Sequence, residues 1–188
     1  DWPDDWQGIL RASNQAGPMT LRANARRNTP TGLRDHLASS GVQATPVGMD
    51  GLTLAEPRPV QDIPGFAEGL WSVQDLAAEQ AGRLLPVSDG MRVLDACAAP
   101  GGKTAHLLER HDIALTALDS DPGRLARVSQ NLDRLRLGGP NVKLLAADAS
   151  QPDTWWDGQA YDAILADVPC TASGVVRRHP DIRWLRRS

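Results

Sequence analysis

The stretch that most constrains the fold of this chain is residues 95–104, DACAAPGGKT, which follows the apolar run 91–94. A short apolar strand that breaks into small residues and a glycine pair, and then into helix formers, is how an α/β sheet presents backbone N–H groups to a ligand. We therefore expect a parallel sheet with a small-molecule site at this turn.

Two phosphate-binding motifs come close to this turn, and neither matches. A P-loop needs a glycine where this chain has Cys97, and the dinucleotide fingerprint needs glycines in the spacing that Ala99 and Pro100 occupy. A turn built of Ala, Pro and two glycines has less anion-binding character than a P-loop. It favours a cationic or zwitterionic adenosine cofactor over a triphosphate.

Three aspartates support that choice, because each ends an apolar run. Asp119 follows residues 113–118, Asp148 follows 142–147, and Asp167 follows 161–166. One such aspartate alone is more often a turn former or a helix cap. Three at successive strand ends converge on one crevice of a doubly wound sheet, and an acid about 20 residues after a glycine turn commonly binds a ribose diol. Asp119 has that spacing.

Together these motifs resemble those of a known enzyme family. Residues 95–104, Asp119, Asp148, the segment 167–174 (DVPCTASG) and the segment 175–185 (VVRRHPDIRWL) are similar to the RNA 5-methylcytosine methyltransferases of the Fmu/Sun type. The resemblance implies transfer of a methyl group from S-adenosylmethionine to C5 of a cytosine in small-subunit ribosomal RNA. It covers only the middle of that family's chain.

The resemblance also implies the fold: an α/β, class I methyltransferase with a Rossmann-like doubly wound sheet, C-terminally incomplete, after a small RRM-like α/β subdomain. Residues 1–64 have a β-α-β-β order that fits the subdomain, and prolines at 57, 59 and 64 indicate a linker. Residues 65–188 are then a partial catalytic domain. We expect a helix over 72–85 and another after Asp121, with an apolar stripe of Leu125, Val128, Leu132 and Leu135.

The small subdomain lacks the aromatic side chains with which RRM domains stack bases, since Phe66 and Tyr161 are the only Phe and Tyr of the chain. Direct base stacking by this subdomain is therefore not expected.

Ten residues match the positions that bind the cofactor in the family. They are Cys97, Ala98, Ala99, Pro100, Gly101, Gly102, Lys103, Asp119, Asp148 and Asp167. We expect Cys97 to contribute its backbone and not its thiol. Lys103 has three open interpretations: a contact to RNA phosphate, a contact to the cofactor carboxylate, or a solvated helix start.

Cytosine C5 is not nucleophilic, so a thiolate must first add at C6. In the family the attacking cysteine lies in a later Thr-Cys-Ser motif, beyond Ser188, while the cysteine of the Pro-Cys motif assists product release. We therefore assign Cys170 to release, with attack by Cys170 as the alternative, and Asp167 to the contact with cytosine N3. Without the later cysteine, we expect this chain alone not to methylate RNA.

An arginine-rich C-terminus is the local basic feature of a chain whose formal net charge is −3. Arg177, Arg178 and Arg183 lie close in sequence to the Asp167–Cys170 motif, which favours phosphate positioning over a merely solvated face. The alternative function is a non-catalytic module that binds RNA or the cofactor.

Composition points to a cytoplasmic protein. Two cysteines, both inside motifs, argue against a disulfide scaffold, and no apolar run reaches the roughly 18 residues of a membrane helix. We expect no metal and no membrane partner, and the sequence leaves the oligomeric state open.

Overall fold

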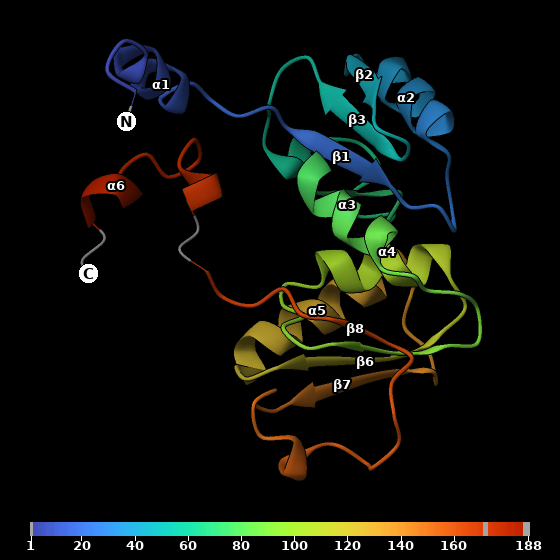
Figure 1. Cartoon of the computed structure of the whole chain (residues 1–188). Coiled ribbons are helices and arrows are strands. Elements are labelled where there is room, and N and C mark those ends of the chain that lie inside the picture. Colours follow the sequence, from blue (N-terminus) through green and yellow to red (C-terminus); the bar gives the residue numbers. More distant parts are fainter. Residues whose placement is uncertain (1, 171–172, 186–188) are drawn as a thin grey trace. The chain divides into compact units, whose positions relative to one another are not determined.

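The computed structural model describes residues 2–170 and 173–185 (Figure 1). Their contacts divide the chain into two compact units. The central unit, Met19–Val168, contains two four-stranded sheets. The terminal unit, Asp1–Pro18 with Pro169–Ser188, holds helices α1 (Trp6–Ser13) and α6 (Ile182–Leu185) and a 3-10 turn, Ser173–Val175. Thr171 and Ala172 of the predicted motif lie outside the described residues.

The first sheet of the central unit is antiparallel, with the order β2-β3-β1-β4. Its strands are β1 (Thr20–Ala23), β2 (Ala44–Val47), β3 (Gly51–Leu54) and β4 (Trp71–Val73). Helix α2 (Pro30–Ser39) connects β1 to β2, and its start follows the sequence: Thr29 accepts a hydrogen bond from Gly32 N at 3.0 Å, and Pro30 occupies the first turn. The β-α-β-β order predicted for the small subdomain is confirmed.

The fourth strand lies beyond residue 64, where the sequence interpretation ends the small subdomain. Leu21 to Ala23 of β1 pair with Val73 to Trp71 of β4. The prediction of a helix over 72–85 is therefore wrong at its start, because Ser72 and Val73 are taken up by this pairing. Helix α3 (Leu76–Leu84) begins only after Asp75, whose side chain caps it by accepting from Ala77 N at 2.9 Å.

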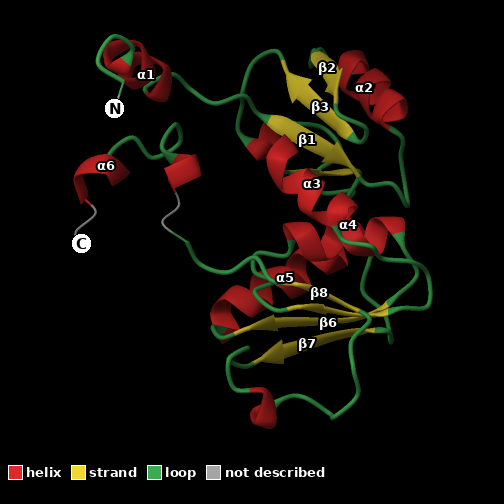
Figure 2. Ribbon diagram, in the orientation of Figure 1, coloured by secondary structure: helices red, strands yellow, loops and turns green. Residues whose placement is uncertain are grey.

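The second sheet is parallel, with the order β7-β6-β5-β8. Figure 2 shows its strands β6, β7 and β8 below the helices. Its strands are β5 (Arg92–Asp95), β6 (Ala114–Asp119), β7 (Val142–Ala146) and β8 (Ala163–Leu165). Helices α4 (Gly102–Arg110) and α5 (Pro122–Leu135) follow β5 and β6, and a 3-10 turn, Pro152–Thr154, follows β7. The predicted α/β fold with a parallel sheet is confirmed.

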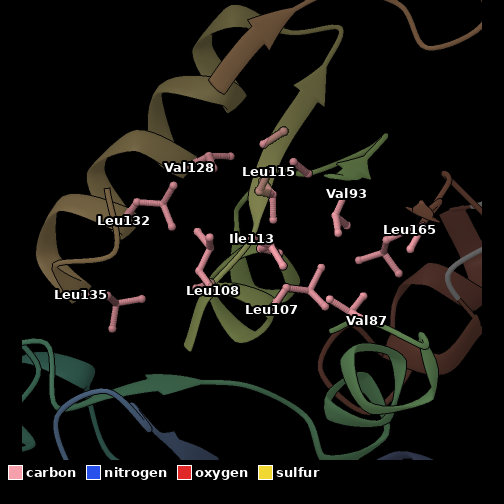
Figure 3. Packing of buried hydrophobic residues seen from close by; sticks show 14 of the residues in the cluster. Val87, Val93, Leu107, Leu108, Ile113, Leu115, Val128, Leu132, Leu135 and Leu165 are labelled. Atoms are coloured by element: carbon pink, nitrogen blue, oxygen red, sulfur yellow. The ribbon is translucent and has the colours of Figure 1, made fainter. Parts of the chain in front are cut away.

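The main core lies between this parallel sheet and its helices. The predicted stripe of α5 is buried at all four positions, and Figure 3 shows Val128 and Leu132 pointing toward Leu115 of β6. A smaller cluster covers the other face of the sheet with Trp155 and Tyr161 beside Leu94 and Leu118. None of the described helices is long and apolar enough to cross a bilayer.

Helix α4 has an unusual position, because it lies between the two sheets (Figure 1). Its residues from Thr104 to Glu109 are all buried, including three polar side chains. A helix that meets water on one side shows a polar stripe. Its whole circumference is covered: α3 and α5 pack against it, its apolar residues join the core of the parallel sheet, and Arg22 of β1 contacts Glu109.

A second link between the sheets is Asn24, which directly follows β1 and is fully buried. Its side-chain amide donates to Gly69 O at 2.9 Å and to Leu135 O, at the end of α5, at 3.0 Å. The chain passes so close to α5 here that a Cβ on Gly69 would lie 2.1 Å from Arg134 O, and Gly69 also has a φ of +71°. Asn24 thus holds the small sheet and α5 in contact.

The substitution Asn24→Ala leaves two buried carbonyl groups without this donor. At about 1–3 kcal/mol for an unsatisfied buried group, we expect the free energy of unfolding to fall by about 2–4 kcal/mol in urea denaturation followed by circular dichroism. Asn141→Ala, at an exposed asparagine, is the control and should change it by less than about 0.5 kcal/mol. Equal stability of the two variants would contradict the role of Asn24.

Candidate functional site

Aspartates lie at the carboxyl ends of all four parallel strands. Asp95 and Asp119 are the last residues of β5 and β6, and Asp148 and Asp167 each come two residues after β7 and β8. Parallel strands bring these ends to one edge of the sheet, which we call the carboxyl edge. The charges of Asp119, Asp95 and Asp167 all act on the thiol of Cys97, so these three lie within electrostatic reach of one point.

The glycine turn lies at this edge between β5 and α4. Gly101 has a φ of +97°, and a Cβ there would come within 3.2 Å of the backbone of Val128 in α5. Only glycine fits both restrictions. Ala98 N donates to Leu118 O at 2.8 Å, so the turn is also tied to the end of β6.

Asp119 connects the glycine turn to the start of α5. Its carboxylate accepts from Ala99 N at 3.2 Å and from Asp121 N at 3.1 Å, and the residue is only 3% exposed. The guanidinium of Arg124 lies 3.7 Å from the same carboxylate and donates to Ala99 O at 3.3 Å. Each carboxylate oxygen keeps a second lone pair, so Asp119 can hold the turn and still accept from a ligand hydroxyl.

Lys103 and Asp167 form an ion pair across the carboxyl edge. Lys103 is the second residue of α4, and Asp167 follows β8, so the pair ties the helix start to the strand end. The ammonium of Lys103 therefore has a carboxylate partner at the helix start. Its contact with RNA phosphate or with a cofactor carboxylate stays a prediction.

Asp148 stands apart from this network. It is exposed, and its carboxylate accepts from Ser150 N at 2.9 Å and from Ser150 Oγ at 2.7 Å. These hydrogen bonds lower the pKa of Asp148 below its ordinary value. Asp148 is ionised at neutral pH, and its role in cofactor binding stays a prediction.

Asp95 is the site residue that sequence reasoning missed. It is 1% exposed, its Oδ2 accepts from Thr104 Oγ1 at 2.6 Å, and its Oδ1 has no hydrogen-bond partner in the described part of the chain. Burial raises the pKa of Asp95 to about 6, although the hydrogen bond from Thr104 opposes that shift. Its place as the last strand residue before the turn was the available signal.

Cys97 is half-buried, and burial together with the nearby carboxylates raises the pKa of its thiol. A raised pKa leaves the neutral thiol at neutral pH, which is a poor nucleophile. This agrees with a backbone contribution from Cys97.

The remaining predicted residues belong to the terminal unit. The thiol of Cys170 is exposed. Arg177 donates to Ala16 O at 2.9 Å and Gln15 O at 3.4 Å, and so ties the two segments of that unit together. Arg178 has contacts of its own, and the side chain of Arg183 lies outside the described part. Their contact with RNA stays a prediction.

Among the side chains of residues 2–170 and 173–185 that the structure describes, no three His, Cys, Asp or Glu come together as metal ligands.

Comparison with known proteins identifies relatives along the whole chain. Residues 83–188 match the family model of the 16S rRNA methyltransferase RsmB/F, and residues 1–61 match the ferredoxin-like domain model of the same group. The ribosomal RNA small subunit methyltransferase B of Pseudomonas syringae pv. tomato is 47% identical over 99% of this chain. Its counterpart from Vibrio cholerae is 46% identical over the full chain. The chain spans 42% and 43% of the lengths of these two relatives.

A solved structure has the same fold. The crystal structure of a methyltransferase homologue protein from Pyrococcus horikoshii superimposes with a TM-score of 0.79 and is 31% identical, over 97% of this chain and 61% of that one. Both sheets therefore occur together in a related protein.

The raised pKa of Asp95 predicts an inverse pH dependence of stability. The pKa of Asp95 is 3.8 in the unfolded chain and about 6 in the folded chain. At pH values between these two, the folded state binds more protons than the unfolded state, so stability falls as the pH rises through this window. Asp95→Asn keeps an acceptor for Thr104 and removes the titration. We subtract the free energy of unfolding of the original chain from that of Asp95→Asn. This difference should rise by about 2 kcal/mol between about pH 4.5 and pH 7.

Urea denaturation of both proteins across this pH range measures the difference, in which the titrations of all other groups cancel. Asp35→Asn, at an exposed carboxylate on α2, is the control and should stay parallel to the unchanged chain. A constant difference for Asp95→Asn would show that Asp95 does not carry a raised pKa.

Proposed function

The chain belongs to the 16S rRNA methyltransferase RsmB/F family, and we propose that it binds S-adenosylmethionine at the carboxyl edge for methyl transfer to C5 of a cytosine in small-subunit ribosomal RNA. The observation that carries the proposal is the set of aspartates at four successive strand ends around one glycine turn. A ribosomal RNA substrate implies the cytoplasm as the place of action.

The groups at this edge fit the methyl donor. S-adenosylmethionine carries a sulfonium, an ammonium and a ribose diol, and when bound it supplies an electrophilic methyl group. Asp119 offers free lone pairs beside the backbone of the turn, and the buried Oδ1 of Asp95 is an acceptor without a partner. Gly101 and Gly102 leave the backbone bare for close approach.

The same groups disfavour a nucleoside triphosphate. Acidic side chains raise the energy of a polyphosphate nearby, because like charges repel most where little water screens them. The one lysine in a P-loop-like position, Lys103, already pairs with Asp167. A cationic ligand is the better match to this charge distribution.

Cytosine chemistry is supported by the order of residues after β8. The ion pair with Lys103 holds the carboxylate of Asp167, which we assign to cytosine N3. Cys170 follows three residues later, and we assign it to release of the methylated product. Arg177, Arg178 and Arg183 are proposed to contact RNA phosphates. The related proteins are named for small-subunit ribosomal RNA, which supports that substrate.

Asp119→Ala tests the donor site in the 188-residue chain. Loss of charge-assisted hydrogen bonds worth about 1.5–3 kcal/mol should weaken binding of S-adenosylmethionine about 10- to 150-fold in calorimetry. Asp35→Ala, at the exposed carboxylate on α2, should leave the affinity unchanged. Unchanged affinity in Asp119→Ala would remove this residue from the site.

Cytosine chemistry is tested in a chimera in which residues 1–188 replace the matching segment of the Pseudomonas syringae relative. We expect transfer of a tritiated methyl group from S-adenosylmethionine to unmodified small-subunit ribosomal RNA. A chimera that folds and binds the donor but transfers no methyl group supports the alternative, a non-catalytic module.

Cys170→Ser in the same chimera separates the two roles of this thiol. If Cys170 serves release, the covalent protein–RNA adduct forms but does not resolve, because elimination across C5–C6 needs an acid or base beside the ring. Denaturing gels should then show a species that accumulates with the donor present. A gel without adduct would instead make Cys170 the attacking thiolate, since a serine without a strong base is a poor nucleophile.

A further inference from the structure

A buried arginine of the small sheet reaches the glycine turn. Arg22, on β1, and Glu109, on α4, have side chains that are each 1% exposed. The guanidinium binds Glu109 with two parallel hydrogen bonds, from Nε to Oε2 at 2.8 Å and from Nη2 to Oε1 at 2.6 Å. The third nitrogen, Nη1, donates to Gly102 O at 2.9 Å and to the side chain of Gln74.

An ion pair in this position is not explained by stability. Removing both charges from water costs about as much as their attraction returns, and apolar side chains of the same volume often stabilise a core equally well. What distinguishes arginine is its rigid fork of donors, which can bind a carboxylate and a carbonyl at the same time. Here that fork connects Glu109, near the end of α4, to Gly102, its first residue.

The turn packs against Val128 of α5 on one side, but it borders a cavity on the other. A cavity of about 220 Å³ lies between the glycine turn and β4, lined by Pro100, Gly101 and Gly102 on one side and by Ser72 and Val73 on the other. Two side chains hold the turn at this cavity: Asn131 donates to Pro100 O at 2.8 Å, and Arg22 donates to Gly102 O. Asn131 comes from α5, and Arg22 from the small sheet.

We propose that Arg22 is a positioning residue for the methyl donor: by binding Gly102 O and Glu109 together it fixes the glycine turn, so the small sheet forms part of the donor site. This inference rests on the proposed function, which places the donor at that turn. The small sheet would then contribute to binding of the methyl donor, separately from any contact with RNA.

The test compares Arg22, which reaches the first residue of α4, with Arg26, which binds α4 only near its other end. Arg22→Lys keeps the charge beside Glu109, but one ammonium cannot reproduce the fork that also reaches Gly102 O. Arg26→Lys is the matched control, since Arg26 binds Leu108 O at 3.0 Å and Asp112 at 2.7 Å, at the far end of the helix. We expect Arg22→Lys to weaken binding of S-adenosylmethionine at least fivefold in calorimetry, and Arg26→Lys less than twofold.

A second readout separates positioning from general loss of stability. In ¹H–¹⁵N spectra of the 188-residue chain without ligand, Arg22→Lys should shift the amide signals of Gly101, Gly102 and Lys103, and Arg26→Lys should leave them in place. Equal donor affinity for the two variants, or unchanged turn signals in Arg22→Lys, overturns the inference while the proposed function stands. If the chain without any substitution does not bind S-adenosylmethionine, the proposed function is overturned and the inference with it.

If Arg22→Lys does not fold, Glu109→Gln answers the same question, because the amide can accept only one of the two hydrogen bonds that orient the guanidinium and Arg22 itself stays in place. Glu109→Gln should then weaken donor binding at least twofold and shift the same amide signals. Affinity and signals equal to those of the unchanged chain overturn the inference.

Discussion

Burial of α4 on all sides is the constraint on which the rest of the structure depends. This helix carries the glycine turn at its start, packs its apolar residues against the parallel sheet and meets the small sheet on its other side. Because one helix serves both layers, the position of the turn depends on the packing of both. The geometry of the proposed donor site therefore depends on contacts that lie outside the parallel sheet.

The polar residues inside this contact are arranged so that most of their charge is compensated. Arg22 pairs with Glu109, and Asp50 accepts from Arg83 at 2.5 Å and from Arg110 at 3.1 Å. Between these pairs lies His106, which is 1% exposed. Burial and the neighbouring arginines, with Asp50 opposing them, lower the pKa of His106 to about 3. The imidazole therefore stays neutral and adds no further positive charge.

The sequence predicted the parts of the fold that local pattern determines. The glycine turn, the strand-ending aspartates and the stripe of α5 each follow from spacing within a short segment. Strand β4 did not, because only its pairing with β1, some fifty residues earlier in the chain, makes Trp71 to Val73 a strand. The family resemblance supplied the chemistry assigned to Asp167 and Cys170, which the pattern of residues could not supply.

Arg22 and Glu109 were missed for a related reason. Charged residues in a sequence are usually solvated, and these two are 87 positions apart. Asp95 also ends an apolar run, but it was passed over because the sequence interpretation took residues 95–104 together as the glycine-turn motif. Long-range burial of charge is the feature that a single sequence does not reveal.

The proline-containing segment 57–64 has the composition of a hinge, yet the contacts around it do not permit hinge motion at low cost. Rotating residues 19–56 about this segment would expose the Arg22–Glu109 pair, break the bonds from Asn24 to Gly69 and Leu135, and separate β1 from its partner strand β4. Cleaving the chain in this segment should therefore leave two pieces that remain associated. Any opening of the molecule toward a large substrate has to take place somewhere other than between its two sheets.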